Sequence, residues 1–244
     1  MPEQPPPLPT PSGLLLIDKE PGYTSMDVCA ILRTRLRRGG APKRIKVGHG
    51  GTLDPLATGL LVVLVGKATP LCNVIMAGEK EYVAGIDLSR RSDTDDEEGP
   101  THAVHVAIPP TREQLLAVLA TFKGAIQQRP PAFSAIKSGG RRAYNIARGG
   151  GEVDLPARTV TVHAVELLAY SYPTLALGIR CGKGTYIRSI ARDLGPLLRT
   201  GGMLSSLRRT RVGEWSIEHA KKLSDLPEVL TQEGLTPIPA LNGA

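Results

Sequence analysis

The segment at residues 48–59, GHGGTLDPLATG, constrains the fold of this chain more than any other, because four of its residues are glycine. Glycine allows positive φ and close approach of backbone segments, so such a loop can close tightly around a polar partner. The aliphatic run LLVVLV follows at residues 60–65 and predicts a buried strand. The pattern therefore places the carboxylate of Asp54 on a rigid loop, either as a turn cap or as a functional group.

The composition favours a nucleic-acid partner. The chain of 244 residues carries 30 Lys and Arg against 23 Asp and Glu, a net charge of +7. Such an excess suits contact with phosphate backbones, although a basic surface kept for solubility is the alternative. With 41% hydrophobic residues the chain can form a real core, and one domain is the simplest organisation.

Three widely separated cysteines, Cys29, Cys72 and Cys181, lack any CxxC spacing and indicate reduced thiols in a cytoplasmic protein. No apolar run approaches the roughly 20 residues needed to cross a bilayer, so no membrane partner is expected. The acidic cluster at residues 92–99 lacks the glycine and terminal glutamate of a calcium loop and predicts a hairpin turn. His102 and His105 should face opposite sides of a strand, so no metal site is predicted.

Strands and helices are expected in alternation along the chain. Strands are predicted at residues 13–19, 60–65, 79–88, 158–168 and 174–182. Helices are predicted after a cap at Thr24 or Ser25, from Pro70 to Met76, after the capping box of Thr111 and Gln114, and at residues 185–198. The Gly-, Pro- and Arg-rich stretch 122–150 predicts a basic, partly mobile loop that ends in a short helix near residues 141–148.

Four motifs, in order, resemble the TruB-type pseudouridine synthases. They are GHGGTLDPLATG at residues 48–59, KEY at 80–82, the stretch from Gln128 to Arg148 with Phe133 where many members carry tyrosine, and KGTYIR at 183–188. The resemblance covers roughly residues 13–223. It implies an α+β pseudouridine synthase fold, with a large mixed, mostly antiparallel sheet flanked by helices and a thumb-like insertion that grips RNA.

The resemblance also implies roles for single residues. Asp54 is the catalytic aspartate, Arg188 pairs with it, and Tyr82 stacks on the target base. Other residues expected at the substrate are His49, Lys80, Arg141, Arg148, Tyr186 and Leu207. From the pattern alone, Tyr82 and Leu207 could equally be core residues and Arg188 an ordinary surface ion pair.

The implied reaction isomerises the T-loop uridine of tRNA, position 55, to pseudouridine. Asp54 would act either as a nucleophile at C1′ or as a base toward the 2′ proton, and neither route needs a cofactor. The partner would be the T-arm of tRNA, bound by a monomer. Two alternatives remain: a non-catalytic RNA-binding module or tRNA folding chaperone, and a pseudouridine synthase that depends on a guide RNA.

The expected domain organisation has three parts. Residues 1–12 form a disordered Pro-rich tail, residues 13–223 the catalytic domain with the thumb-like insertion at about 124–155, and residues 224–244 a short C-terminal extension. Several long relatives carry a C-terminal PUA domain, for which the extension is too short.

Overall fold

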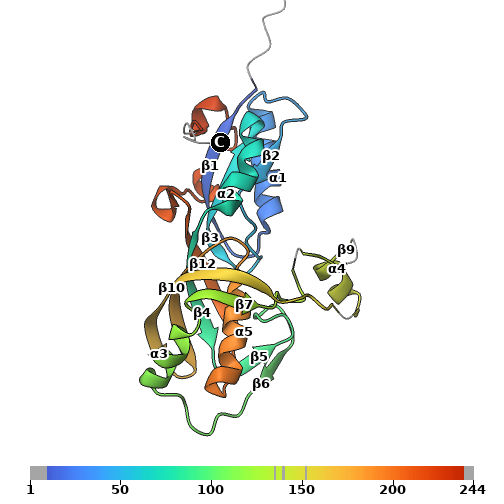
Figure 1. Cartoon of the computed structure of the whole chain (residues 1–244). Helices are drawn as coiled ribbons and strands as arrows, with labels where there is room; N and C mark the ends of the chain where they lie inside the picture. Colours follow the sequence, from blue (N-terminus) through green and yellow to red (C-terminus); the bar gives the residue numbers. More distant parts are fainter. Residues whose placement is uncertain (1–9, 135, 139–140, 152, 239–244) are drawn as a thin grey trace, which may run out of the picture. The chain divides into compact units, whose positions relative to one another are not determined.

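The computed structural model of the chain describes residues 10–134, 136–138, 141–151 and 153–238 (Figure 1). Contacts divide the chain into two compact units: Met1–Gly78 with Arg209–Ala244, and Glu79–Arg208. Most of the predicted N-terminal tail and the last residues of the C-terminal extension lie outside the described residues.

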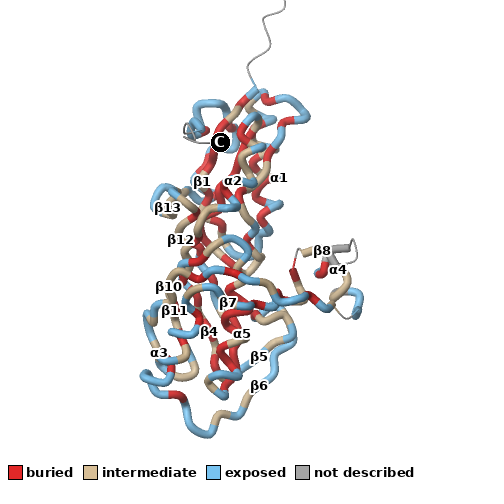
Figure 2. Tube along the Cα trace, in the orientation of Figure 1, coloured by how far each residue is buried: buried red, intermediate tan, exposed pale blue. Residues whose placement is uncertain are grey.

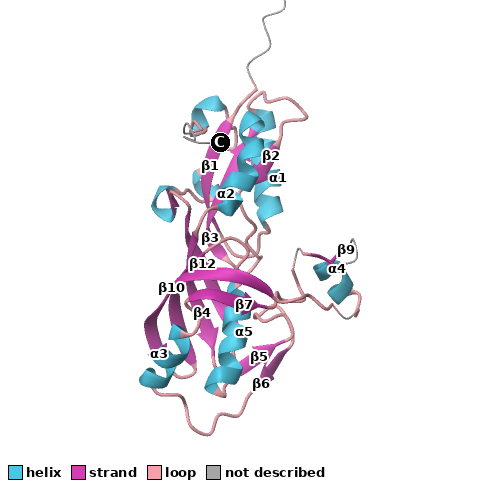
Figure 3. Cartoon of the chain, in the orientation of Figure 1, coloured by secondary structure: helices cyan, strands magenta, loops and turns pink. Residues whose placement is uncertain are grey.

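Figure 3 shows strands as the dominant element, with fewer helices. The helices are α1 (Ser25–Arg38), α2 (Cys72–Ala77), α3 (Arg112–Ala120), α4 (Ala143–Arg148), α5 (Ile187–Leu198) and the 3₁₀ turns η1 (Gly66–Leu71), η2 (Ile217–His219), η3 (Leu223–Asp225) and η4 (Gln232–Gly234). The strands are β1 (Gly13–Lys19), β2 (Val47–His49), β3 (Thr58–Val65), β4 (Lys80–Asp87), β5 (Arg90–Ser92), β6 (Thr101–Ala103), β7 (Gly124–Gln128), β8 (Lys137–Ser138), β9 (Arg141–Arg142), β10 (Arg158–Ser171), β11 (Thr174–Cys181), β12 (Met203–Val212) and β13 (Trp215–Ser216).

In the first unit the aliphatic strand β3 is the centre of the core. It pairs antiparallel with β1 along its whole length, from Gly13 opposite Val65 to Lys19 opposite Gly59. The predicted run at residues 60–65 is completely buried, which confirms the buried strand. The short strand β2 pairs with the far end of β3, so the glycine loop leaves from one strand and returns into its neighbour.

Helix α1 is capped by Thr24, one of the two predicted caps. The Thr24 hydroxyl accepts from the backbone N–H of Asp27 at 3.1 Å, and the Asp27 carboxylate accepts from the Thr24 N–H at 2.9 Å. This capping box satisfies donors that the first helical turn leaves open and places an acidic residue near the positive end of the helix.

In the second unit the sheet order is β12, β4, β11, β10 and β7, with antiparallel pairing from β4 to β7. The large, mostly antiparallel sheet with few helices confirms the predicted α+β class. Figure 2 shows buried residues along β4 and α5 of this unit. The predicted turn at residues 92–99 connects the β5–β6 hairpin, and α3 begins at the predicted capping box of Thr111.

Several predicted elements need correction. Residues 124–128, expected in a loop, form β7, because β10 supplies them with strand partners. Strands β2 and β12 are additional to the predicted elements. Pro70 lies inside the 3₁₀ turn η1 and not at the start of a helix, and α2 begins only at Cys72. His102 lies in β6 but His105 lies outside it, so the prediction that one strand carries both histidines is wrong.

Candidate active site

The loop that carries Asp54 is fixed on both sides of that residue by other elements of the first unit. The Leu53 N–H donates to the Ser25 hydroxyl at 2.8 Å, and the same hydroxyl lies 3.1 Å from the Leu53 carbonyl. On the other side, the Pro55 carbonyl accepts from the buried Lys19 Nζ at 3.2 Å. Asp54 itself is partly buried. Because the peptides before and after it are held, its backbone has little freedom to move.

Arg209 on β12 also binds this loop, and the sequence analysis did not predict it. Its guanidinium donates to the carbonyls of Leu60 at 2.8 Å, Gly51 at 3.0 Å and Thr52 at 3.3 Å. The signal for it was present but ambiguous: Arg209 lies two residues after Leu207, and residues two apart on a strand share one face. Arginine rarely occupies a buried position, so the sequence alone gives no reason to place Arg209 inside the protein.

His49 ends β2 at the entrance of the loop. Its buried Nδ1 has no hydrogen-bond partner among the described residues. Burial lowers the pKa of His49 below its usual value, and the positive charge of Arg209 lowers it further. The imidazole is therefore neutral at pH 7, with a ring nitrogen available for a hydrogen bond to a ligand.

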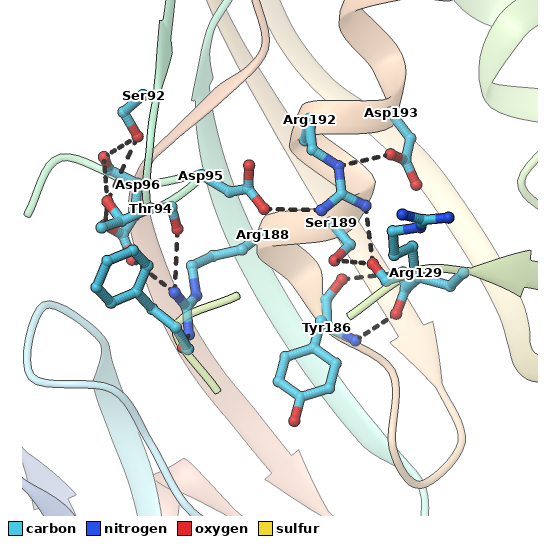
Figure 4. Close-up of polar contacts among 12 residues, drawn as sticks. Ser92, Thr94, Asp95, Asp96, Arg129, Tyr186, Arg188, Ser189, Arg192 and Asp193 are labelled. Atoms are coloured by element: carbon cyan, nitrogen blue, oxygen red, sulfur yellow. Dashed lines mark hydrogen bonds and ion pairs between the residues drawn. The ribbon is translucent and has the colours of Figure 1, made fainter. Parts of the chain in front are cut away.

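Arg188 lies in the first turn of α5, as predicted, and its side chain is buried in the second unit (Figure 4). Its Nη1 donates to the Thr94 carbonyl at 3.0 Å and forms an ion pair with Asp96 at 3.2 Å. Its Nη2 donates to the Phe133 carbonyl at 2.9 Å. The guanidinium therefore connects the turn of the β5–β6 hairpin with the segment that follows β7.

Asp96 was missed by the sequence analysis, which assigned its acidic cluster only to a turn. The Asp96 carboxylate also accepts from the Thr94 hydroxyl at 2.5 Å and from the Glu98 N–H at 3.1 Å. These bonds satisfy a carboxylate that is only 1% exposed. A carboxylate at this depth requires a positive partner, and Arg188 is that partner.

Ser189 and Arg192 of α5 hold the same two segments. The Ser189 hydroxyl donates to the Arg129 carbonyl at 2.9 Å, and Arg192 donates to that carbonyl at 2.8 Å. Arg192 also forms an ion pair with Asp95 at 2.9 Å (Figure 4). Asp95 has a positive φ of 64°, and its burial raises the pKa of its carboxyl, opposed by the charge of Arg192. One helix face therefore fixes both loops through charged hydrogen bonds.

The remaining predicted site residues of the second unit lie on three elements. Tyr82 and Lys80 are on β4, where Tyr82 is partly buried and pairs with Ile179 across the sheet. Leu207 is buried on β12. Tyr186 caps α5, its N–H donates to the Gln128 side chain at 2.8 Å, and its ring lies 5.2 Å from the Arg158 guanidinium.

The predicted residues fall into different units. Asp54 and His49 belong to the first, whereas Arg188, Tyr82, Lys80, Tyr186 and Leu207 belong to the second. The pairing of Arg188 with Asp54 therefore stays a prediction. Arg141 is in β9 and Arg148 ends α4, but their side chains lie outside the described part of the structure.

Phe133 takes the position where tyrosine is common in the family motif. Its ring packs edge to face with Tyr144 of α4, with ring centroids 6.4 Å apart. Phe133 thus packs against another aromatic ring, and the expectation that it retains the packing of a tyrosine stays a prediction.

Within the described ranges, no three His, Cys, Asp or Glu side chains are grouped so that they could hold a metal ion. The described helices also include none that is long and apolar enough to cross a membrane.

Comparisons with known proteins agree with these features. Residues 37–187 match the family model described as TruB family pseudouridylate synthase, N-terminal domain. A tRNA pseudouridine synthase B of Parabacteroides distasonis is 41% identical over 90% of this chain and 93% of its own length. One of Leifsonia xyli subsp. xyli is 47% identical over 88% of this chain and 72% of its own length.

Among solved structures, a chain of a Cbf5-Nop10-Gar1 complex matches with a TM-score of 0.68 and 30% identity, covering 92% of this chain and 59% of that one. A second match, in an H/ACA RNP bound to a substrate RNA containing 2′-deoxyuridine, has a TM-score of 0.64 and 28% identity over 92% of this chain and 58% of that one. Sequence motifs, sheet topology and both kinds of relative thus agree, and the chain belongs to the TruB family of pseudouridylate synthases, which makes it an RNA pseudouridine synthase.

Proposed function

We propose that this enzyme isomerises the T-loop uridine of tRNA, position 55, to pseudouridine, with Asp54 as the catalytic group. The observation that carries the proposal is the fixed backbone on both sides of Asp54, through Ser25 and Lys19. A carboxylate held in this way is already oriented toward one atom of the bound ribose and needs no large reorientation before it reacts. The names of the 41% and 47% identical relatives support tRNA as the substrate.

The reaction needs one carboxylate and one extruded nucleotide. Ionised Asp54 either attacks C1′ of the ribose or removes the 2′ proton, and in both cases the N1–C1′ bond breaks. The uracil then turns within the pocket and C5 bonds to C1′, which displaces the Asp54 ester in the first route and is accompanied by return of the proton to C2′ in the second. C5 then loses its proton and N1 gains one. Substrate and product are isomers, so the proposed mechanism uses no cofactor. Arg188 is proposed to stabilise the ionised carboxylate, as a guanidinium does near an acid.

Base extrusion costs a few kcal/mol, which contacts to the flipped uridine must offset. Tyr82 is proposed to stack on the base, and stacking contributes about 1 to 3 kcal/mol per base. Neutral His49 and the side chains of Tyr186 and Leu207 are proposed to line the same pocket, with Lys80, Arg141 and Arg148 near the RNA. The charge of +7 supports contact with the T-arm backbone. A cytoplasmic monomer is the proposed form.

The decisive experiment compares wild type with Asp54→Asn on unmodified tRNA tritiated at C5 of uridine, without guide RNA. Reattachment through C5 releases that tritium, so wild type should release one equivalent at position 55. Asp54→Asn should release none while its Kd for a T-arm hairpin changes by less than about threefold. Asp225→Asn, an exposed aspartate of the same unit, is the matched control and should behave like wild type.

Three results would contradict parts of the proposal. Release by Asp54→Asn at the wild-type rate would refute the catalytic assignment. Binding without release by wild type would favour a non-catalytic chaperone. Release that appears only after a guide RNA is added would favour a guide-dependent enzyme. A tRNA with cytidine at position 55 identifies the target nucleotide, because release should then disappear.

A further inference from the structure

Among the residues that the structure describes, Arg209 is the largest side chain that is almost completely buried, with 1% of its surface exposed. Within the described part of the chain, none of its contacts is an ion pair, and its guanidinium donates to three backbone carbonyls. A buried cation is costly, and a leucine would fill similar space without that cost. Packing alone therefore does not explain why an arginine occupies this position.

The three carbonyls enclose the segment that carries Asp54. Those of Gly51 and Thr52 precede Asp54, and that of Leu60 follows it at the start of the buried run of β3. One planar guanidinium with donors in a fixed fork thus joins the two ends of the loop. Because Leu60 lies in the buried, strand-paired β3, the bond to its carbonyl fixes the guanidinium. The bonds to the Gly51 and Thr52 carbonyls then hold the part of the loop that precedes Asp54.

The backbone of Arg209 contacts the loop as closely as its side chain does. Gly59 has a φ of +96°, and a Cβ built there would lie 2.3 Å from the Arg209 carbonyl oxygen. Gly51 has a φ of +134° and faces the guanidinium Nη1, 3.5 Å from its ideal Cβ position. Close approach to the Arg209 backbone requires glycine at position 59, whereas at position 51 the contact is an ordinary one and glycine is favoured by the positive φ.

We propose that Arg209 is a positioning residue for Asp54: it holds the loop so that the carboxylate stays at the place where the ribose must arrive. Arg209 acts through the loop carbonyls and not on the RNA. The inference rests on the proposed role of Asp54 and extends it to a residue of a distant strand.

His49 supplies a reporter of the Arg209 charge that does not depend on catalysis. The charge of Arg209 is one of two causes that lower the pKa of His49, the other being burial. Replacing Arg209 with methionine should therefore raise the pKa of His49 toward its usual value, whereas lysine, which keeps the charge, should leave it low. Imidazole NMR signals measure this pKa directly.

The test uses Arg209→Lys and Arg209→Met in the full chain, with Arg211→Lys and Arg211→Met as controls. Arg211 lies on the same strand, and its guanidinium donates to Gly213 outside the loop. Arg209→Lys keeps a buried cation but loses the fork, so kcat should fall by about 100-fold, while the Kd for a T-arm hairpin changes by less than about threefold. The kcat of Arg209→Met should be lower still, so that lysine restores part of the activity that methionine loses. Both Arg211 variants should retain wild-type kcat.

Amide exchange supplies a second readout that is independent of activity. Exchange at Gly51, Thr52 and Leu53 should accelerate in folded Arg209→Lys, while exchange within β3 stays slow. The proposal is overturned if Arg209→Lys keeps kcat within about threefold of wild type, or if kcat falls with no change in loop exchange. If Asp54→Asn proves active, the proposed function fails, yet loop exchange and the His49 titration still report whether Arg209 fixes the loop.

Discussion

Arg188 and Asp96 form an ion pair at 3.2 Å in which both side chains are almost completely buried. Two further carbonyl contacts of Arg188, to Thr94 and Phe133, leave the guanidinium with a defined orientation. A pair at this depth contributes little net stability by itself, but removing one partner leaves a buried charge without its counterion. The pair is therefore a sensitive point of the second unit.

Asp96→Asn should destabilise the protein by about 3 to 5 kcal/mol, since it keeps the side-chain shape and removes only the charge. Urea unfolding measures the loss, and kcat should fall with it because Arg188 is no longer held. Asp93→Asn is the control: Asp93 lies in the same turn and pairs with His102 at an exposed position, so its loss should cost less than about 1 kcal/mol. If both variants lose the same free energy of unfolding, burial of the Arg188–Asp96 pair does not make it more important for stability than an exposed pair.

Stability should decrease as the pH falls below the ordinary His49 pKa of 6.5. The folded-state pKa of His49 is lowered, so below pH 6.5 the unfolded chain binds a proton that the folded chain binds only at lower pH. The contribution is complete above pH 6.5 and is lost as the pH falls through the folded pKa. Urea unfolding of wild type and His49→Gln between about pH 7.5 and about pH 5.5 should show that wild type loses more stability. If the free energy of unfolding depends on pH in the same way for both proteins, the predicted contribution of His49 is wrong.

Two of the three thiols should resist alkylation in the native protein. Burial raises the pKa of Cys29 and of Cys181 to about 11, which reduces the reactive thiolate about 100-fold relative to a thiol of pKa 9.0. Cys72 is less buried, and its pKa is raised as well. Iodoacetamide at about pH 8 should modify Cys72 first, and mass spectrometry identifies the site. In urea all three should react alike, so fast labelling of Cys29 or Cys181 without urea would contradict their burial.

Comparing Gly59→Ala with Gly22→Ala separates the cost of backbone strain at positive φ from the cost of a steric clash of the added Cβ. Both glycines have positive φ, but an added Cβ at Gly22 meets nothing within 4 Å, whereas at Gly59 it meets the Arg209 backbone. Gly22→Ala should cost about 1 to 2 kcal/mol from strain alone, and Gly59→Ala should cost a further 1 to 3 kcal/mol or so. Thermal unfolding ranks the two variants. If they cost the same, the close contact between Gly59 and Arg209 does not constrain the loop.

Elements defined by local patterns were predictable from the sequence. The strand at residues 13–19 has the predicted bounds, and the capping box at Thr111 begins α3 as expected. Strand β7, GAIQQ, was not predictable, since its sequence has little strand preference and its pairing comes from β10, distant in sequence. Local residue propensities contain no information about a strand partner that is distant in sequence.

The polar residues inside the protein escaped prediction for a different reason. Arg209 and Asp96 are charged, and charged residues are almost always exposed unless they are paired. Each becomes interpretable only once its partners are in place: three carbonyls for Arg209, and Arg188 for Asp96. The family motifs identified the expected chemistry, whereas the groups that support it came from the tertiary structure.

The hydrogen bond from Arg188 to the Phe133 carbonyl links the segment after β7 directly to α5. The Arg129 carbonyl, four residues earlier, is tied to the same helix by Ser189 and Arg192. Any displacement of Phe133 must stretch its 2.9 Å bond or carry the Arg188 guanidinium with it. A displacement of Phe133 therefore reaches this arginine through one hydrogen bond, without passing through the sheet.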